Sequence, residues 1–387
     1  MLTRLHFKNW RSLKDVTIDN LTPLTVFIGA NSSGKTNIVD GLDFMIKMMS
    51  GDPTPAVRAN RGNKTRTLNT DDEDALVFSA TYLDPVSKKH LTYEMNLKIE
   101  TAKDLPTYFH SHLCEGEKRL FTQTIDKFPI LVFGISRWRE ASWADEGHFI
   151  EGIDQHEAEH LLRRTKIFVQ ERWQILGEGF LPKLAVTFAE LGAIYPIQNN
   201  GANLVAILDY MRDAHPNIFT LFQQDIAWML NHIEHVDINL IKDQEARFSI
   251  FENAHPSIEA PTISAGTAHI AAMLAAYYAF DFKNQELPGL VIIEEPDTAL
   301  NPGLLEKFVE LLRDYVSDPE KPRQFIMTTH NPAFLDFFQP EEVRVVSRDE
   351  QGYTHVDPIP EHIKEVWLDK YGLGEVWMTR AFGGLPE

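Results

Sequence analysis

The strongest constraint on this sequence is a pattern of glycine and lysine close to its N-terminus. Residues 29–36 read Gly-Ala-Asn-Ser-Ser-Gly-Lys-Thr and match G-x-x-x-x-G-K-[ST]. An apolar run at 24–28 precedes this pattern, and apolar residues at helical spacing follow it between Ile38 and Met49. This order predicts a strand, a loop and a helix, which is the context that a phosphate-binding loop needs. A chance glycine turn does not require that context, so the sequence predicts nucleotide binding.

The residue types in this loop fit the needs of phosphate binding. Gly29 and Gly34 let the backbone turn tightly and approach phosphate, while N–H groups of the loop and the helix start form an anion site. Lys35 is expected to reach the β- and γ-phosphates, and the Thr36 hydroxyl to bind Mg²⁺. The expected ligands are therefore ATP and Mg²⁺. The predicted nucleotide-binding residues of this loop are Gly29, Asn31, Ser32, Ser33, Gly34, Lys35, Thr36 and Asn37.

The composition is that of a globular chain with an acidic balance. Its 387 residues allow roughly two or three domains. The net charge of −19 counts against non-specific binding of nucleic acid through the overall field. No apolar run approaches the roughly 18 residues of a membrane helix, and the N-terminus lacks a signal-peptide layout, so no membrane association is expected. Cys114 is the single cysteine, which indicates a reducing, cytoplasmic location.

The pattern changes along the chain in a way that predicts a split α/β fold. Residues 1–140 form the expected N-terminal half with the phosphate-binding loop, and 141–245 an inserted, mainly helical lobe. Residues 246–350 are expected to complete the nucleotide-binding fold, because β-rich runs flank a helical stretch there, as in a parallel sheet. Residues 351–387 form a tail that is a possible partner dock.

Single elements follow from periodicity. The alternation at 91–99 predicts an antiparallel, half-exposed sheet, so the fold combines antiparallel and parallel sheets around the phosphate-binding loop. The other expected strands are 75–82, 130–133, 290–293 and 325–327, and the expected helices are 203–211, 218–233 and 303–315.

An acidic pair follows the apolar run 290–293. Glu294 is expected to hold Mg²⁺, directly or through water, and Glu295 to orient or deprotonate an attacking water molecule. An acidic pair after a strand is often only a solvated turn. The phosphate-binding loop in the same chain favours the catalytic interpretation.

His330 follows the β-rich run 325–327. In open α/β sheets, ligands bind at the carboxyl ends of the strands. His330 is therefore either a sensor of the γ-phosphate or a satisfied surface histidine at a turn, and its place downstream of the acidic pair favours the first. Lys35, Glu295 and His330 form the predicted catalytic set.

A second candidate phosphate site lies at Ser264 and Gly266. A Ser-x-Gly turn that opens a helix presents a hydroxyl, N–H groups and the positive end of a helix dipole. One γ-phosphate does not need two such sites from the same subunit, so this site is expected to serve a nucleotide bound by another copy. The alternative is a plain serine-capped helix.

In this order the motifs resemble those of the ABC-class ATPases, and among them the RecF-like and OLD-like (overcoming lysogenisation defect) ATPases. The resemblance implies two ABC-type heads that stack head to tail around two ATP molecules. Each ATP is held by one P-loop and capped by the Ser-x-Gly turn of a second copy, and hydrolysis uses Glu295 and His330. The residues that carry the resemblance are 29–36, Lys8-Asn9-Trp10-Arg11-Ser12-Leu13, Ser264-Ala265-Gly266-Thr267, Glu294-Glu295-Pro296, Thr298-Ala299-Leu300-Asn301 and His330.

Two parts of the family pattern have no direct match in this sequence. Gln123 and Gln170 are candidates for the Q-loop glutamine only because they lie in the intervening region. Asn301 stands where many relatives carry Asp or His, which leaves the contact of this loop across the dimer open.

The C-terminal end separates this chain from the OLD nucleases of the family. Those carry a TOPRIM nuclease domain, and the residues after His330 are too few for one and contain no Asp-x-Asp pair. The end resembles that of stand-alone ATPase subunits of bacterial anti-phage systems, which implies a separately encoded effector, a nuclease or another toxin. Trp367, Trp377 and Phe382 are expected either to form its docking surface or to lie in the core.

Three functions follow from these observations. The first is an ATPase that controls a separate effector in anti-phage defence. The second is a RecF-like DNA-repair ATPase that clamps duplex DNA, and the acidic net charge counts against it. The third is a nucleotide-dependent scaffold without hydrolysis, which the presence of both Glu295 and His330 disfavours.

Overall fold

The chain forms two compact units, and each is described by itself. Unit 1 consists of Met1–Arg172, Gln339–Gly372 and Val376–Glu387, and unit 2 of Trp173–Phe338 and Leu373–Glu375. The four segments predicted from the sequence remain predictions of domain limits. The computed structural model describes residues 1–49, 75–100, 105–126, 147–149, 154–177, 182–187, 197–198, 200–241, 245–252, 258–259, 262–282, 288–366 and 371–384.

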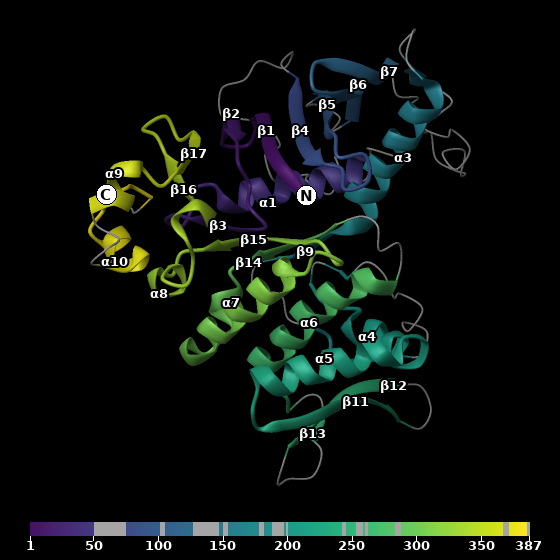
Figure 1. The fold of residues 1–387 in the computed structure, drawn as a ribbon, viewed down its shortest axis with the longest axis vertical. Helices are drawn as coiled ribbons and strands as arrows, with labels where there is room; N and C mark the ends of the chain where they lie inside the picture. The colour runs from purple at the N-terminus through teal and green to yellow at the C-terminus, as the bar shows by residue number, and fades with distance from the viewer. Residues whose placement is uncertain are drawn as a thin grey trace. The chain divides into compact units, whose positions relative to one another are not determined.

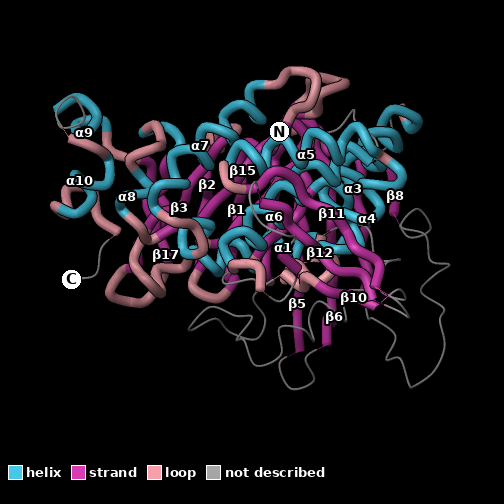
Figure 2. Tube along the Cα trace, turned by 90° about the horizontal axis from the view of Figure 1, so that it is seen from below, coloured by secondary structure: helices cyan, strands magenta, loops and turns pink. Residues whose placement is uncertain are grey.

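An antiparallel sheet forms a large part of unit 1. In order across the sheet, its strands are β2 (Leu13–Ile18), β1 (Leu2–Trp10), β4 (Leu76–Leu83), β5 (His90–Glu100), β6 (Leu105–Glu115), β7 (Lys118–Asp126) and β8 (Gly147–Phe149). Side chains of β5 alternate between buried and partly exposed from Leu91 to Leu97, which confirms the predicted half-exposed sheet. Figure 2 shows β5 and β6 as long neighbouring strands. The strand predicted at 130–133 lies outside the described residues.

The phosphate-binding loop lies in unit 1 between β3 (Leu24–Ile28) and α1 (Lys35–Met49), as the sequence predicts. Every residue of β3 is buried. β3 pairs in parallel with β16 (Val343–Arg348), which pairs in antiparallel with β17 (Thr354–Pro358). Residues from both ends of the sequence therefore form the strands next to the loop.

An aromatic cluster holds α1 against the antiparallel sheet. The rings of Trp10, Phe44 and Phe78 are 5.0 to 5.2 Å apart, and all three side chains are buried. Rings at this spacing contribute roughly 0.5–1.5 kcal/mol per pair beyond the area they bury. Two further helices of unit 1 are α3 (Gln155–Arg172), which packs beside α1, and α9 (Glu361–Val366).

A parallel set of strands lies in unit 2. β14 (Gly289–Glu294) pairs in parallel with β15 (Arg323–Thr329) and with β9 (Trp173–Leu176). The predicted β-α-β order is confirmed, because α7 (Pro302–Ser317) connects β14 to β15. The short α8 (Pro332–Leu335) follows β15. β9 is a buried strand within the stretch that the sequence predicted to be mainly helical.

The helix α6 (Ala265–Tyr278) is a core element of unit 2. Its residues from Thr267 to Tyr278 are buried on every side, which is typical of a helix enclosed by other elements. Ser264 caps its N-terminus, since the side chain accepts a hydrogen bond from the N–H of Thr267. Neither α6 nor any other helix in the described ranges is long and apolar enough to cross a bilayer.

Two helices of unit 2 pack on a second antiparallel sheet, and Figure 1 shows α5 lying along its strands. The predicted helix 218–233 is too long, because the helix ends at Met229 and Ile233 begins a strand that pairs with its neighbour. The elements of this layer are α4 (Leu204–Ala214), α5 (Pro216–Met229), β10 (Ala185–Thr187), β11 (Ile233–Ile241), β12 (Glu245–Glu252) and β13 (Ile258–Glu259).

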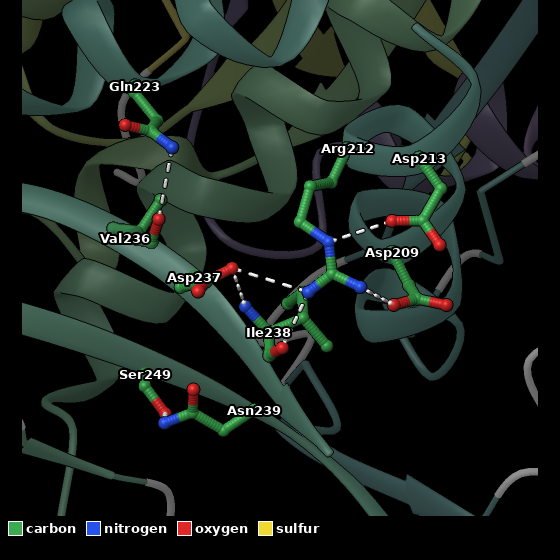
Figure 3. Close-up of polar contacts among 9 residues, drawn as sticks. All are labelled: Asp209, Arg212, Asp213, Gln223, Val236, Asp237, Ile238, Asn239 and Ser249. Carbon is green, nitrogen blue, oxygen red and sulfur yellow. Dashed lines mark hydrogen bonds and ion pairs between the residues drawn. The ribbon is translucent and has the colours of Figure 1, made fainter. Parts of the chain in front are cut away.

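Arg212 fixes α4 on this sheet, as Figure 3 shows. Its guanidinium donates to Asp209 at 2.7 Å and to Asp213 at 2.9 Å on the helix side. On the strand side it donates to the carbonyl of Ile238 at 2.6 Å and approaches Asp237 at 3.3 Å. A planar guanidinium with several donors suits such a junction between a helix and a strand.

A buried ion pair lies just after the C-terminal end of α6. Asp281, in the 3₁₀ turn η2 (Ala279–Phe282), pairs with Arg323, and both side chains are 1% exposed. The guanidinium of Arg323 also lies over the ring of Phe280 at 5.2 Å. Lys321 reaches the same carboxylate at 2.9 Å from a more exposed position. Asp281 therefore neutralises a guanidinium that water does not reach.

Asp281→Asn is expected to lower the free energy of unfolding by about 3–5 kcal/mol, because it leaves a buried charge without its partner. Urea unfolding followed by circular dichroism measures this loss. Lys321→Met is the matched control, since it removes the exposed partner of the same carboxylate, and it is expected to cost less than about 1 kcal/mol. Equal losses in the two variants would contradict the assigned role of the buried pair.

Candidate functional site

Lys35 is bound to the carbonyl groups of its own loop. Its Nζ donates to the carbonyl of Gly29 at 2.7 Å and to that of Ala30 at 3.0 Å. The side chain is buried, with 6% of its surface exposed. These two bonds hold the amine against the backbone of its own loop.

Two glycines of the loop are required by close approaches. A Cβ on Gly29 would lie 2.2 Å from the carbonyl oxygen of Val346. Gly34 has a φ of +115°, and a Cβ there would lie 2.1 Å from Oγ1 of Thr354. Ser32 adopts a φ of +66°, which favours glycine but is tolerated in tight loops. The loop therefore stores strain next to the predicted phosphate position.

The N-terminal motif braces the start of α1. Nε1 of Trp10 donates to the carbonyl of Asn37 at 2.8 Å, and Nδ2 of Asn37 donates to Oγ of Ser12 at 2.6 Å. Arg11 forms an ion pair with Asp40 one turn along the helix. The side chain of Asn37 is thus hydrogen-bonded within the protein, and its assignment to the nucleotide stays a prediction.

Thr354 is a loop contact that sequence reasoning missed. Its Oγ1 donates to the carbonyl of Ser33 at 2.8 Å and lies 2.7 Å from Oγ of Ser12. Its methyl group occupies the space beside Gly34. Thr354 is 1% exposed. No local pattern marks this residue, because it is 321 positions from Ser33 in the chain.

The acidic pair lies at the end of β14, as predicted. Glu294 is the last residue of the strand and is buried. Glu295 has a φ of +47°, in the left-handed region that is uncommon for residues other than glycine. Its N–H donates to the carbonyl of Thr328 at 3.0 Å, which ties this strained residue to β15.

Glu295 and His330 are in direct contact. Oε1 of Glu295 and Nδ1 of His330 are 2.8 Å apart, and the carboxylate is 12% exposed while the imidazole is 41% exposed. Two residues that the sequence predicted separately are therefore brought together at the ends of β14 and β15. A carboxylate held by an imidazole at a partly open site fits a group that exchanges a proton with water.

Asp297 is a buried acidic residue that the sequence analysis did not select. Burial raises the pKa of its carboxyl, and a hydrogen bond from the hydroxyl of Thr329 at 2.9 Å opposes this shift. Thr329 also accepts a hydrogen bond from the N–H of Asn331. Asp297 thereby fixes the backbone on both sides of His330. Its position directly after the Glu-Glu-Pro motif was the available signal.

Ser264 and Gly266 lie at the exposed start of α6. Ser264 is exposed, and its Oγ lies 2.9 Å from Oγ1 of Thr267. A Cβ on Gly266 would lie 2.9 Å from the carbonyl oxygen of Ala299, so glycine is needed where the two segments approach. Asn301 caps α7 by accepting from the N–H of Gly303 at 3.0 Å. The Ser-x-Gly turn therefore packs on the segment that follows the acidic pair.

The C-terminal aromatic residues lie in the core where the structure describes them. Trp377, in α10 (Leu373–Met378), and Phe382 are both buried, and Trp367 lies outside the described residues. Of the two Q-loop candidates, Gln123 is in β7 and Gln170 in α3. The predicted loop residues lie together in unit 1, and Ser264, Gly266, Glu294, Glu295 and His330 lie in unit 2.

Comparison with known proteins gives two family matches. The model described as "AAA ATPase domain" matches residues 1–132, and the model described as "AAA domain, putative AbiEii toxin, Type IV TA system" matches residues 198–336. Two SMC head domains have a similar fold. One, bound to the C-winged helix domain of ScpA, has a TM-score of 0.57 at 13% identity and covers 94% of this chain and 99% of that one. The second, with an extended coiled coil and bound to the C-terminal domain of ScpA derived from Pyrococcus furiosus, has a TM-score of 0.55 at 12% identity and covers 95% and 98%.

These matches confirm the ABC-type ATPase head as the fold class. An OLD nuclease from Thermus scotoductus is 24% identical over 402 residues, which cover 99% of this chain and 68% of that protein. Together with the two family matches, this likeness supports the predicted resemblance to OLD-like and RecF-like ATPases of the ABC class.

Thr354→Val is expected to lower the free energy of unfolding by about 1–3 kcal/mol, because it removes the hydroxyl that binds Ser33 and Ser12 while keeping the shape. Thr354→Ser is the matched control, because it keeps the hydroxyl and loses only a methyl group, and it is expected to cost less. Urea unfolding of both variants measures the difference. A serine variant less stable than the valine variant would show that packing, and not hydrogen bonding, holds the loop.

Proposed function

We propose that the chain binds and hydrolyses ATP and that hydrolysis controls a separate effector. The observation that carries hydrolysis is the contact between Glu295 and His330 at the ends of two parallel strands. A structural ion pair alone would not require Glu295 in a left-handed conformation, and strained backbone concentrates at functional sites.

The P-loop binds the phosphates of ATP in this proposal. Lys35 leaves its carbonyl partners and donates to the β- and γ-phosphates, which are stronger acceptors because they are charged. The backbone of the loop and the start of α1 bind the remaining phosphate oxygens. The contributing residues are Gly29, Asn31, Ser32, Ser33, Gly34, Thr36 and Asn37.

Thr36 and Glu294 are the proposed protein ligands of Mg²⁺. A hydroxyl and a carboxylate are the hard oxygen donors that Mg²⁺ prefers, and this ion commonly takes few protein ligands besides phosphate and water. When bound, Mg²⁺ neutralises the charge that develops on the phosphates. Thr36 is exposed at the start of α1, so its hydroxyl is accessible.

Glu295 is the proposed general base. It takes a proton from the attacking water while the oxygen of that water bonds to the γ-phosphorus and the bond to the bridging oxygen breaks. His330 holds the carboxylate in place before ATP binds and contacts the γ-phosphate afterwards. Asp297 and Thr329 keep the backbone beside His330 fixed during this exchange.

The active assembly in this proposal is a head-to-tail dimer with two ATP molecules between the heads. Ser264 is exposed although it caps a helix whose other residues are largely buried, so the start of α6 is open to a second copy. Ser264 and Gly266 of one copy contact the γ-phosphate held by the P-loop of the other. Helix N-termini bind such anions through their N–H groups and dipole.

A separate effector, a nuclease or another toxin, and a role in anti-phage defence complete the proposal. The support is the likeness to an OLD nuclease over 68% of that protein and the family description that names a putative toxin. The acidic chain, with a net charge of −19, disfavours direct clamping of DNA.

Glu295→Gln is expected to bind ATP normally, to hydrolyse it about 10²–10⁴-fold more slowly, and to accumulate as a dimer or larger assembly, because the amide cannot accept the proton. Phosphate release and light scattering in the presence of ATP measure these effects. Glu310→Gln makes the same change on the exposed side of α7 and is expected to behave as the wild type. Unchanged hydrolysis in Glu295→Gln would remove Glu295 from the role of base.

Mixing two inactive variants tests whether the site is shared. Lys35→Ala is expected to lose ATP binding, and Ser264→Arg to block the second half of the site. A mixed dimer retains one complete site, so an equimolar mixture is expected to recover roughly one quarter of the wild-type activity for random pairing in a symmetric dimer. No recovery at any ratio, with mixed dimers shown to form, would mean that each chain holds a complete site.

A further inference from the structure

The C-terminal turn at Gly383 and Gly384 lies against the P-loop within unit 1. The carbonyl of Gly384 accepts a hydrogen bond from the N–H of Ala30 at 2.5 Å. A Cβ on Gly384 would lie 3.7 Å from Cα of Gly29 and 2.9 Å from Cγ1 of Val345. Gly384 is buried, whereas Gly383 is exposed. The C-terminal turn is thus in contact with Gly29 and Ala30, the first residues of the phosphate-binding pattern.

Trp377 holds this turn in place. Its Nε1 donates to the carbonyl of Gly383 at 2.9 Å, and its ring is 1% exposed. Gly383 and Gly384 have φ values of +78° and +79°, a conformation that side chains other than hydrogen rarely adopt. The buried indole anchor and the close packing around Gly384 therefore fix where the Gly384 carbonyl points.

One residue, Ala30, connects this turn to the amine of Lys35. The N–H of Ala30 is bound by Gly384, and the carbonyl of the same residue accepts from Nζ of Lys35 at 3.0 Å and from the N–H of Ser33 at 3.1 Å. A shift of the Gly384 carbonyl would turn Ala30 and displace the loop backbone, so the N–H groups of the loop and Lys35 would meet a phosphate in a different geometry. Groups that bind in a fixed geometry lose affinity steeply when they are displaced.

We propose that the Gly383–Gly384 turn, anchored by Trp377, is a positioning element of the P-loop that sets its affinity for the phosphates of ATP. The inference rests on the proposed ATP binding at the same loop. The C-terminal turn would thus affect nucleotide binding directly, an effect that the sequence pattern of the P-loop alone does not predict.

The test compares Gly384→Ala with Gly383→Ala in the full chain. Both changes add a methyl group at almost the same positive φ, a region that is unfavourable for alanine at either position. At Gly383 the new methyl group meets nothing within 4 Å, whereas at Gly384 it meets Val345 and the anchor Trp377. Comparing the two variants therefore distinguishes an effect caused by displacement of the turn from one caused by backbone strain alone.

Gly384→Ala is expected to raise the Kd and the KM for MgATP about tenfold, with kcat changed less than about twofold, because the loop contributes binding that substrate and transition state share. Gly383→Ala is expected to stay within about twofold of the wild type in all three constants, since strain alone leaves the loop contacts in place. Equilibrium dialysis gives Kd and the number of binding sites. A variant that is only partly folded would show fewer sites at unchanged Kd, which would overturn the positioning role.

A second variant keeps the inference testable if Gly384→Ala does not fold. Trp377→Phe keeps a buried ring and removes the donor to Gly383, and it is expected to raise the Kd for MgATP about three- to fivefold through loss of one hydrogen bond. An unchanged Kd in Trp377→Phe, or equal Kd values in the two glycine variants, would overturn the inference. Failure of the wild-type chain to bind MgATP would instead overturn the proposed function.

Discussion

The P-loop depends on its close packing against Thr354. The methyl and hydroxyl groups of this side chain occupy the space that a Cβ on Gly34 would need, and the hydroxyl binds the carbonyl of Ser33. A loop whose N–H groups are to face a phosphate must have its carbonyls and side chains held by other segments. Three segments hold the loop in unit 1. Thr354 at the start of β17 donates to the carbonyl of Ser33, Ser12 of the N-terminal motif contacts Thr354, and the carbonyl of Gly384 accepts from the N–H of Ala30.

The end of β14 is held in a comparable way. Glu295 occupies a conformation that costs roughly 1–3 kcal/mol, and hydrogen bonds to Thr328 and His330 offset that cost. Asp297 accepts a desolvation penalty, visible as a raised pKa, to bind Thr329. A strained backbone and a desolvated carboxyl thus lie at the residues proposed to activate water or next to them. Stability is therefore lowered where the proposed chemistry takes place.

Much of the fold was predictable because its signals are local. The helix after the P-loop, the strands β14 and β15, and the alternation in β5 follow from periodicity. β9 was missed, because a short apolar run after a long helix cannot be told from more helix. The helix predicted to reach Ile233 ends at Met229, because an apolar residue at that spacing fits a strand as well.

The sequence by itself determined which residues make up the candidate site: the glycines, Lys35, Glu295 and His330 form patterns whose residue types favour phosphate chemistry. The tertiary structure decided which residues, distant in the sequence, contact the P-loop and hold its backbone in place. Ser12 and Thr354 are separated by 342 positions, and hydrogen bonds at Gly383 and Gly384 link Trp377 to Ala30. No local pattern encodes such pairs. They come into contact only when distant backbone segments approach each other in the folded chain.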